Sequence, residues 1–209
     1  MFSLQTMFGK GDRFYTLLEA SAGAAREGAE ALQGLLQARG EAPLLDVFRA
    51  ARRREKELAA QISEALVNTF VTALDREDIE AMSSALYRIP KSIEKFAERY
   101  AIVAARVRGI DFASRAALLM NATAGVCEMV HELRKGMNVG RMRKLQQRLQ
   151  ATESEADRML LETYRTLYLD SDEPIRMMLA KDLFELLEEA IDRCRDVGNV
   201  IYAIVLKHS

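Results

Sequence analysis

Two pairs of acidic residues in the second half of the chain have a spacing that could support chemistry. Glu153 and Asp157 are four residues apart, and so are Glu188 and Asp192. In a helix this spacing places both carboxylates of a pair on one face, a turn apart. Carboxylate oxygens are the ligands that hard cations prefer. If two such helices lie side by side, the four acids could form a site for iron or another hard divalent or trivalent cation.

Further polar residues continue the same side of the second of these helical segments. Asp196 lies four residues after Asp192, and Asn199 lies three residues further on, so each could add an oxygen ligand. Both could equally belong to a polar surface. Acid pairs at this spacing also arise by chance in a chain with 31 acidic residues. A solvated helix face with surface ion pairs is therefore the alternative interpretation of the whole set.

The elements that must position these residues are six long helical segments. Apolar residues at helical spacing and intervening glycine, proline and acidic turns predict helices at about 12–37, 44–70, 76–103, 112–135, 141–168 and 175–206. Asp12 and Asp75 are expected as N-caps, and Pro90 should kink the third helix. The predicted fold class is all-α, with antiparallel helices.

The two halves of the chain repeat the same order of helical segments. A shift of 101 residues aligns apolar positions such as Leu86 with Leu187 and Phe96 with Val197. We therefore expect an N-terminal tail at 1–11, a first three-helix repeat at 12–108 and a second at 109–209, both packed as one domain.

The candidate site differs between the two repeats. The shift of 101 residues carries the four acids onto Arg52, Lys56, Tyr87 and Lys91. A metal ion beside lysine and arginine is strongly opposed. The first repeat therefore predicts a degenerate site that binds no metal. Its basic residues could instead pair with acids across the repeats or between subunits, and a basic side chain could then take the cation's place.

Four segments carry a family resemblance: residues 72–79 (TALDREDI), 153–157 (ESEAD), 187–201 (LEEAIDRCRDVGNVI) and 204–207 (IVLK). In this order and spacing they resemble the PhoU-like family, in particular its branch of Pit accessory proteins, also called phosphate transport regulators. The resemblance extends over nearly the whole chain, from about Phe8 onward.

The resemblance implies a fold, a metal and a role. The family fold is two repeated three-helix bundles, similar to spectrin repeats. Members carry Glu/Asp-x-x-x-Asp motifs that hold iron or zinc clusters, and they act in phosphate uptake or its regulation, often beside a phosphate transporter. This sequence departs from the pattern in the first repeat, at the four positions named above and at Arg88, and it has Tyr202 where relatives often have an acid. The resemblance thus implies a metal in the second repeat only.

Composition narrows the class of partner. The chain has 49% apolar and 29% charged residues and a net charge of −1, so it has no global attraction for nucleic acid. No apolar run is long enough for a transmembrane segment, and Cys127 and Cys194 are expected as buried free thiols. We expect a cytoplasmic protein, with peripheral attachment at the inner face of the membrane as a further option.

Two basic clusters could be either docking surfaces for a partner or solvated helix faces. They comprise Arg49, Arg52, Arg53, Arg54 and Lys56 in one and Arg134, Lys135, Arg141, Arg143, Lys144 and Arg148 in the other. Docking would require an acidic partner, an anion or a membrane surface, whereas neighbouring acids favour a solvated face. Aromatic residues do not alternate with these charges, which argues against nucleic acid.

No set of residues in the sequence predicts an enzyme. Glu128 and His131 have the spacing of a di-iron ligand pair, but a ferritin-like site needs a second such pair, so we expect a surface histidine. The favoured hypothesis is a regulator or accessory protein that contacts a membrane phosphate transporter or signalling protein and forms a homo-oligomer. The alternatives are a metal-free helical oligomeric scaffold and, more remotely, a metal-dependent phosphate-ester hydrolase.

Overall fold

The computed structural model describes residues 4–37, 45–170 and 173–209, with side chains for 12–37, 45–166 and 173–209. This part of the chain contains six helices and no β-strand, as the sequence predicts. The helices are α1 (Leu4–Gln37), α2 (Asp46–Asn68), α3 (Arg76–Val103), α4 (Ala113–Lys135), α5 (Val139–Asp170) and α6 (Pro174–Lys207).

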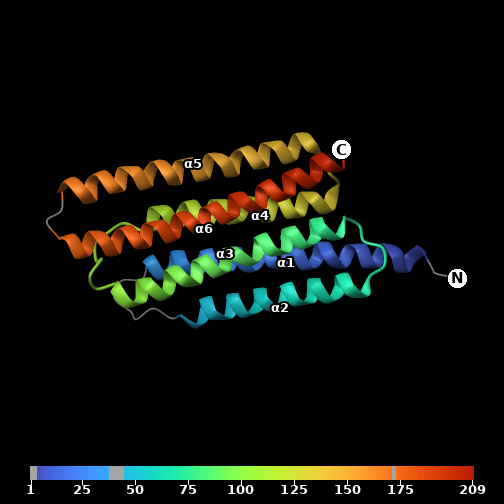
Figure 1. Cartoon of the computed structure of the whole chain (residues 1–209), viewed down its shortest axis with the longest axis horizontal. Coiled ribbons are helices and arrows are strands. Elements are labelled where there is room, and N and C mark those ends of the chain that lie inside the picture. Colours follow the sequence, from blue (N-terminus) through green and yellow to red (C-terminus); the bar gives the residue numbers. More distant parts are fainter. Residues whose placement is uncertain (1–3, 38–44, 171–172) are drawn as a thin grey trace.

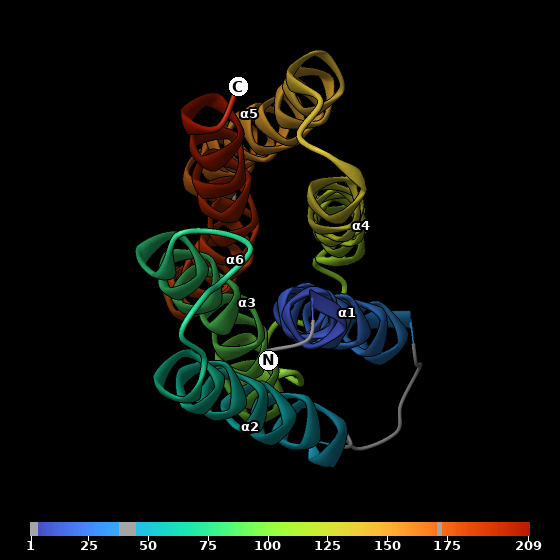
Figure 2. The same ribbon diagram turned by 90° about the vertical axis from the view of Figure 1, so that its right-hand side faces the viewer.

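The helices run along one long axis and fall into two groups of three (Figure 1). The first group is α1, α2 and α3, and the second is α4, α5 and α6. The groups meet where α3 packs along α6 and where α1 packs along α4. Within the described residues, α2 and α5 contact only helices of their own group. The end view in Figure 2 accordingly places α2 and α5 on opposite sides of the molecule.

A continuous apolar core joins the two groups, and Phe112 lies at its junction. This residue comes from the connection between α3 and α4. Its ring centroid lies 6.0 Å from that of Phe96 on α3 and 4.5 Å from that of Phe184 on α6. All three rings are at most 2% exposed. Because burying each ring stabilises the fold by about 1.5–3 kcal/mol, the connection between the halves is anchored in the core.

The first helix begins earlier than the sequence pattern suggests. The structure starts α1 at Leu4, so the expected N-cap at Asp12 is wrong, and residues 4–11 of the expected tail are helical. The carbonyl of Asp12 accepts a hydrogen bond from Thr16 Oγ1 at 3.0 Å, as in a helix interior. No proline interrupts this segment, so nothing in the backbone stops the helix before Asp12. The break expected between the first two helices, at 38–44, lies outside the described residues.

Two other local predictions fall on α3. Asp75 occupies the N-cap position, and its carbonyl accepts hydrogen bonds of 3.1 Å from the amides of Asp78 and Ile79. Its side chain makes no capping hydrogen bond. Pro90 is buried inside α3, which continues to Val103.

Both cysteines are free thiols, as expected. Cys194 is buried, and Cys127 is half-buried. Burial raises the pKa of both thiols. Over the described part of the chain, no helix combines the length and apolar character needed to cross a bilayer.

Candidate functional site: an acid cluster that holds Arg195

Antiparallel packing of α5 against α6 brings the four predicted acids together. Glu153 and Asp157 come from α5, and Glu188 and Asp192 come from α6. Burial raises the pKa of Glu188 to about 7, and repulsion from the carboxylates of Asp192, Asp157 and Glu153 adds to the effect. Like charges that shift a pKa in this way must lie close to it. The acids therefore form one electrostatically coupled cluster.

A basic residue, Arg195, lies inside this cluster. Its Nη1 donates a hydrogen bond to Oε1 of Glu153 on the neighbouring helix. The same nitrogen lies 3.2 Å from Asp192 Oδ1, and Nη2 lies 3.7 Å from Asp196 Oδ1. The Arg195 side chain is 29% exposed, and that of Glu153 only 13%. Three carboxylates from two helices thus surround one partly sheltered guanidinium group.

One carboxylate oxygen of Asp192 forms an ion pair with Arg195 but no hydrogen bond. Its Oδ1 is buried and lacks a hydrogen-bond partner, although Arg195 Nη1 lies within ion-pair distance. The angle is therefore unfavourable even though the distance is short. Burial is the main cause that raises the pKa of Asp192, Glu153 adds repulsion, and Arg195 opposes both. This carboxylate depends on the Arg195 charge for its compensation.

The two further predicted oxygen ligands have other partners. Asp196 lies 3.2 Å from Nη1 of Arg193, besides its contact with Arg195. Asn199 Oδ1 accepts a hydrogen bond from Gln146 Nε2 on α5, so its amide oxygen serves the helix contact. Asp196 therefore belongs to the edge of the acid cluster, and Asn199 belongs to the α5–α6 packing interface.

The corresponding positions of the first group form a different arrangement. Arg52 is buried, and its guanidinium carbon lies 3.8 Å from the centre of the Tyr87 ring. Its Nη1 donates a hydrogen bond of 3.2 Å to the Tyr87 carbonyl, and its Nε lies 3.9 Å from Glu94 Oε2. Lys56 and Lys91 are exposed. Arg52 thus bridges α2 and α3 within its own repeat.

Arg195 and Glu94 were not predicted as site residues, although the internal repeat relates them. The shift of 101 residues that maps Arg52 onto Glu153 also maps Glu94 onto Arg195. The same two helix positions therefore carry an arginine–glutamate pair in both groups, with the charges exchanged. Applying the repeat to every residue of the last helix would have found this pair.

The acids suit a hard cation by chemistry but not in their present arrangement. Within the described residues, the one trio of His, Cys, Asp or Glu with ligand atoms within 4.8 Å of one another is Asp75, Asp78 and His208. Around Glu153 and Asp192 the guanidinium group of Arg195 takes up the intervening space. As arranged, this set does not fit a metal ion.

The two acids of this trio, Asp75 and Asp78 at the start of α3, also form ion pairs with a basic residue of α6. Lys207 Nζ contacts the Asp75 carboxylate and lies 3.2 Å from Asp78 Oδ2, and His208 Nε2 lies 3.5 Å from the same oxygen. The neighbouring Lys207 lowers the pKa of Asp75. This cluster fastens the end of α6 to the turn between α2 and α3.

The basic clusters of the sequence are largely balanced by acids. Arg54 Nη1 lies 2.7 Å from Glu27, Arg141 Nε 2.9 Å from Glu132, and Arg148 Nη1 2.8 Å from Glu128. His131 is exposed, and its Nδ1 lies 2.9 Å from Glu19 Oε1, which confirms the expectation of a surface histidine. These contacts favour the interpretation of the clusters as solvated faces.

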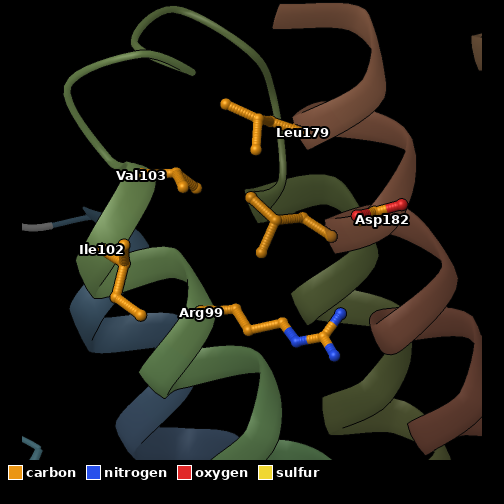
Figure 3. Close-up of a pocket in the computed structure, with 6 residues that line it drawn as sticks. Arg99, Ile102, Val103, Leu179 and Asp182 are labelled. Atoms are coloured by element: carbon orange, nitrogen blue, oxygen red, sulfur yellow. The ribbon is translucent and has the colours of Figure 1, made fainter. Parts of the chain in front are cut away.

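An apolar groove opens between the end of α3 and the start of α6 (Figure 3). It has a volume of about 230 Å³ and is lined by Arg99, Ile102, Val103, Leu179, Asp182 and Leu183. Ile102 is 83% exposed, and Ile175 and Met178 on the first turns of α6 are 63% and 57% exposed. Ile102 is thus accessible in the lining of this groove, which contains residues of both repeats, and the two other exposed apolar side chains lie on the turns of α6 that lead to Leu179.

Comparison with known proteins shows which sequences and folds this chain resembles. No protein-family model matches the chain. A protein of Rhizobium meliloti (strain 1021) named "Putative pit accessory protein" is 22% identical over 201 residues, which cover 94% of each chain. A crystal structure of a PhoU-like protein from Shewanella oneidensis MR-1 matches 93% of this chain and 99% of its own, with 15% identity and a TM-score of 0.77.

A second crystal structure from Shewanella oneidensis MR-1, described as a "putative PhoU-like phosphate regulatory protein", covers the same shares at 16% identity, with a TM-score of 0.78. These identities are low, but the matches run along the entire bundle. They confirm the resemblance stated from the sequence: the chain has the PhoU-like fold and is similar over nearly its whole length to a protein named for a Pit accessory role.

Proposed function

We propose that this protein regulates or assists inorganic phosphate transport by binding a membrane phosphate transporter or a signalling partner. The observation that carries the proposal is the similarity to a protein named for a Pit accessory role, which covers 94% of both chains. The PhoU-like fold supports the same role, because a solved structure with this fold is described as a phosphate regulatory protein.

In this proposal the protein acts by contact and not by catalysis. The relatives are named as accessory and regulatory proteins. Two of the acids that a metal-dependent phosphate-ester hydrolase would use, Glu153 and Asp192, are engaged by Arg195. The protein would work in the cytoplasm, at the inner face of the membrane where the cytoplasmic loops of a transporter are accessible.

The surface that best suits partner contact is the α3–α6 groove. Its exposed apolar residue Ile102 lies beside charged groups of both signs, Arg99 and Asp182. Apolar contact area with a charged margin is the usual composition of a protein interface. A second group of exposed apolar residues, Val67 at the end of α2 and Phe70 and Val71 in the turn after it, is the competing surface.

Deletion of the gene tests the function directly. We expect uptake of radiolabelled inorganic phosphate to change in the deletion strain and to return to its original rate when the wild-type gene is restored. Co-purification of the tagged protein with a co-expressed Pit-type transporter tests the partner. Unchanged uptake together with unchanged phosphate-dependent signalling would contradict the proposal.

A metal-free homo-oligomeric scaffold is the second candidate function. It is favoured by one observation, namely that Arg195, a residue of the protein itself, offsets part of the negative charge of the acid cluster. Light scattering coupled to size-exclusion chromatography separates the candidates when it is combined with the uptake assay. A stable oligomer whose loss leaves phosphate uptake unchanged would favour the scaffold.

A further inference from the structure

We infer that Arg195 is the resident cation of the acid cluster between α5 and α6. Its guanidinium group joins the two helices through their carboxylates, as a bound metal ion would, and it keeps a metal ion out. The inference concerns only the chemistry of this cluster and does not depend on the role in phosphate transport.

The contacts of Arg195 span both helices of the cluster. Nη1 donates a hydrogen bond to Glu153 on α5 and lies 3.2 Å from Asp192 Oδ1 on α6. Nη2 lies 3.7 Å from Asp196 Oδ1. A metal ion bridging Glu153 and Asp192 would need the same oxygens and the same space. Since the guanidinium group cannot be deprotonated in a protein, no change of pH within the physiological range removes its charge.

A second arginine on the same helix, Arg193, lies at the edge of the cluster. Arg193 lies 3.4 Å from Glu189 Oε1 and 3.2 Å from Asp196 Oδ2. Among the described residues, it forms no ion pair or hydrogen bond with Glu153 or Asp192. Arg193 therefore shares the environment and the charge of Arg195 without bridging the helices, and this makes it a matched control.

The first repeat supports the role of an ion pair as a bridge. There Arg52 on α2 and Glu94 on α3 occupy the positions of Glu153 and Arg195, with the charges exchanged. The acids of the cluster are absent from that repeat, where Lys56 and Lys91 stand instead. One arginine–glutamate pair between the middle and last helices is thus common to both repeats, whereas the surrounding acids are not.

Metal uptake by three variants tests the inference. Arg195→Gln removes the charge at similar side-chain length, Arg195→Lys keeps the charge, and Arg193→Gln controls for position. Each protein is incubated with Mn²⁺ or Fe²⁺ without oxygen, desalted, and analysed for metal by mass spectrometry. We expect stoichiometric metal in Arg195→Gln only. At metal concentrations 100-fold above the dissociation constant, its melting temperature should rise by roughly 5–10 °C.

Several results would overturn the inference. Stoichiometric metal in the wild-type protein or in Arg195→Lys would do so, as would an Arg195→Gln variant that takes up no more metal than Arg193→Gln. If Arg195→Gln does not fold alone, it is refolded with and without Mn²⁺. Recovery only with the metal supports the inference, and failure to recover with it contradicts the inference. The phosphate-uptake assay is a separate readout, so failure of one proposal is distinguishable from failure of the other.

Discussion

At the residue scale, a buried carboxyl group shows how strongly the environment sets the behaviour of one side chain. Glu55 is 0% exposed, its Oε1 accepts a hydrogen bond of 2.8 Å from Ser21, and its Oε2 lacks a partner. Burial raises its pKa to about 7, although Ser21, Arg52 and Arg54 oppose the shift. The corresponding residue of the second repeat is Ala156, so the helix packing itself does not require an acid here.

Glu55 should make the stability of the protein depend on pH. Its folded-state pKa of about 7 lies above its reference value of 4.5, so ionisation destabilises the folded state. Its effect is absent below pH 4.5, and stability falls as the pH rises from 4.5 to 7, by up to about 3 kcal/mol. Urea unfolding should therefore show that Glu55→Gln is more stable than wild type at pH 8, with a smaller difference at pH 5.

The exposed neighbour Glu57 provides the control for this prediction. Glu57→Gln should change the free energy of unfolding by no more than about 0.5 kcal/mol at either pH. Because Glu188 also has a raised pKa, only the difference between Glu55→Gln and wild type isolates the Glu55 contribution. An equal difference at pH 5 and pH 8 would show that Glu55 does not titrate in this range.

A close helix approach makes Gly198 sensitive to substitution. A Cβ atom there would lie 2.5 Å from Gln146 Oε1 and 2.6 Å from Leu149 Cδ1, both on buried side chains of α5. We expect Gly198→Ala to lower the free energy of unfolding by about 1–2 kcal/mol. Gly34→Ala is the matched control, because nothing lies within 4 Å of its Cβ position. Chemical denaturation should find the control unchanged or more stable by about 0.5–1 kcal/mol.

At the scale of elements, the second group of helices is fastened near one end by Arg115. This residue of α4 is 7% exposed and donates hydrogen bonds to the Met159 carbonyl at 2.6 Å and to Thr163 Oγ1, both on α5. Its guanidinium carbon lies 4.2 Å from the centre of the Phe184 ring on α6. One side chain therefore links all three helices of the group.

Removal of Arg115 should loosen this group of helices. We expect Arg115→Ala to lower the free energy of unfolding by about 2–3 kcal/mol, because it removes two hydrogen bonds to α5, a cation–π contact and buried aliphatic packing. Arg158→Ala, which removes an exposed ion pair with Glu162, should cost at most about 0.5 kcal/mol. Equal effects of the two substitutions in urea unfolding would show that Arg115 does not join the helices energetically.

At the scale of the whole molecule, the two groups form one bundle with different surfaces at its two ends. The α3–α6 groove lies at one end, and the turn after α2 lies at the other with the chain's C-terminus (Figure 1). Ile102 and Val67 mark the two ends and are both 83% exposed. Because both are β-branched and equally accessible, substitutions at the two positions can be compared directly.

Partner binding should respond to only one of these two positions. Ile102→Asp should abolish co-purification with a co-expressed Pit-type transporter, because a charge placed in an apolar contact must be desolvated. Val67→Asp should leave co-purification intact. Neither should change the melting temperature by more than about 2 °C, since both side chains are exposed. The reverse result would move the contact surface to the turn after α2.

Local sequence pattern was enough to predict the six helices and their order. Apolar residues recur at helical spacing over long segments, as in α3 and α6, and helix formation responds to that local pattern. Most predicted helix ends lie within two residues of the observed ends, because capping and fraying are local as well. Leu4 was missed as the start of α1, since no local signal there separates a helix from a tail.

The sequence by itself determined that Glu153 and Asp157 lie on one helix face, as do Glu188 and Asp192 on another, because i,i+4 spacing is a periodic property. Only the tertiary structure decided which cation accompanies them. Arg195 meets Glu153 across 42 residues, Arg52 turns inward onto Tyr87 across 35, and Lys207 reaches Asp78 across 129. Such contacts depend on how helices pack and which rotamers the packing leaves open, and no local spacing records either.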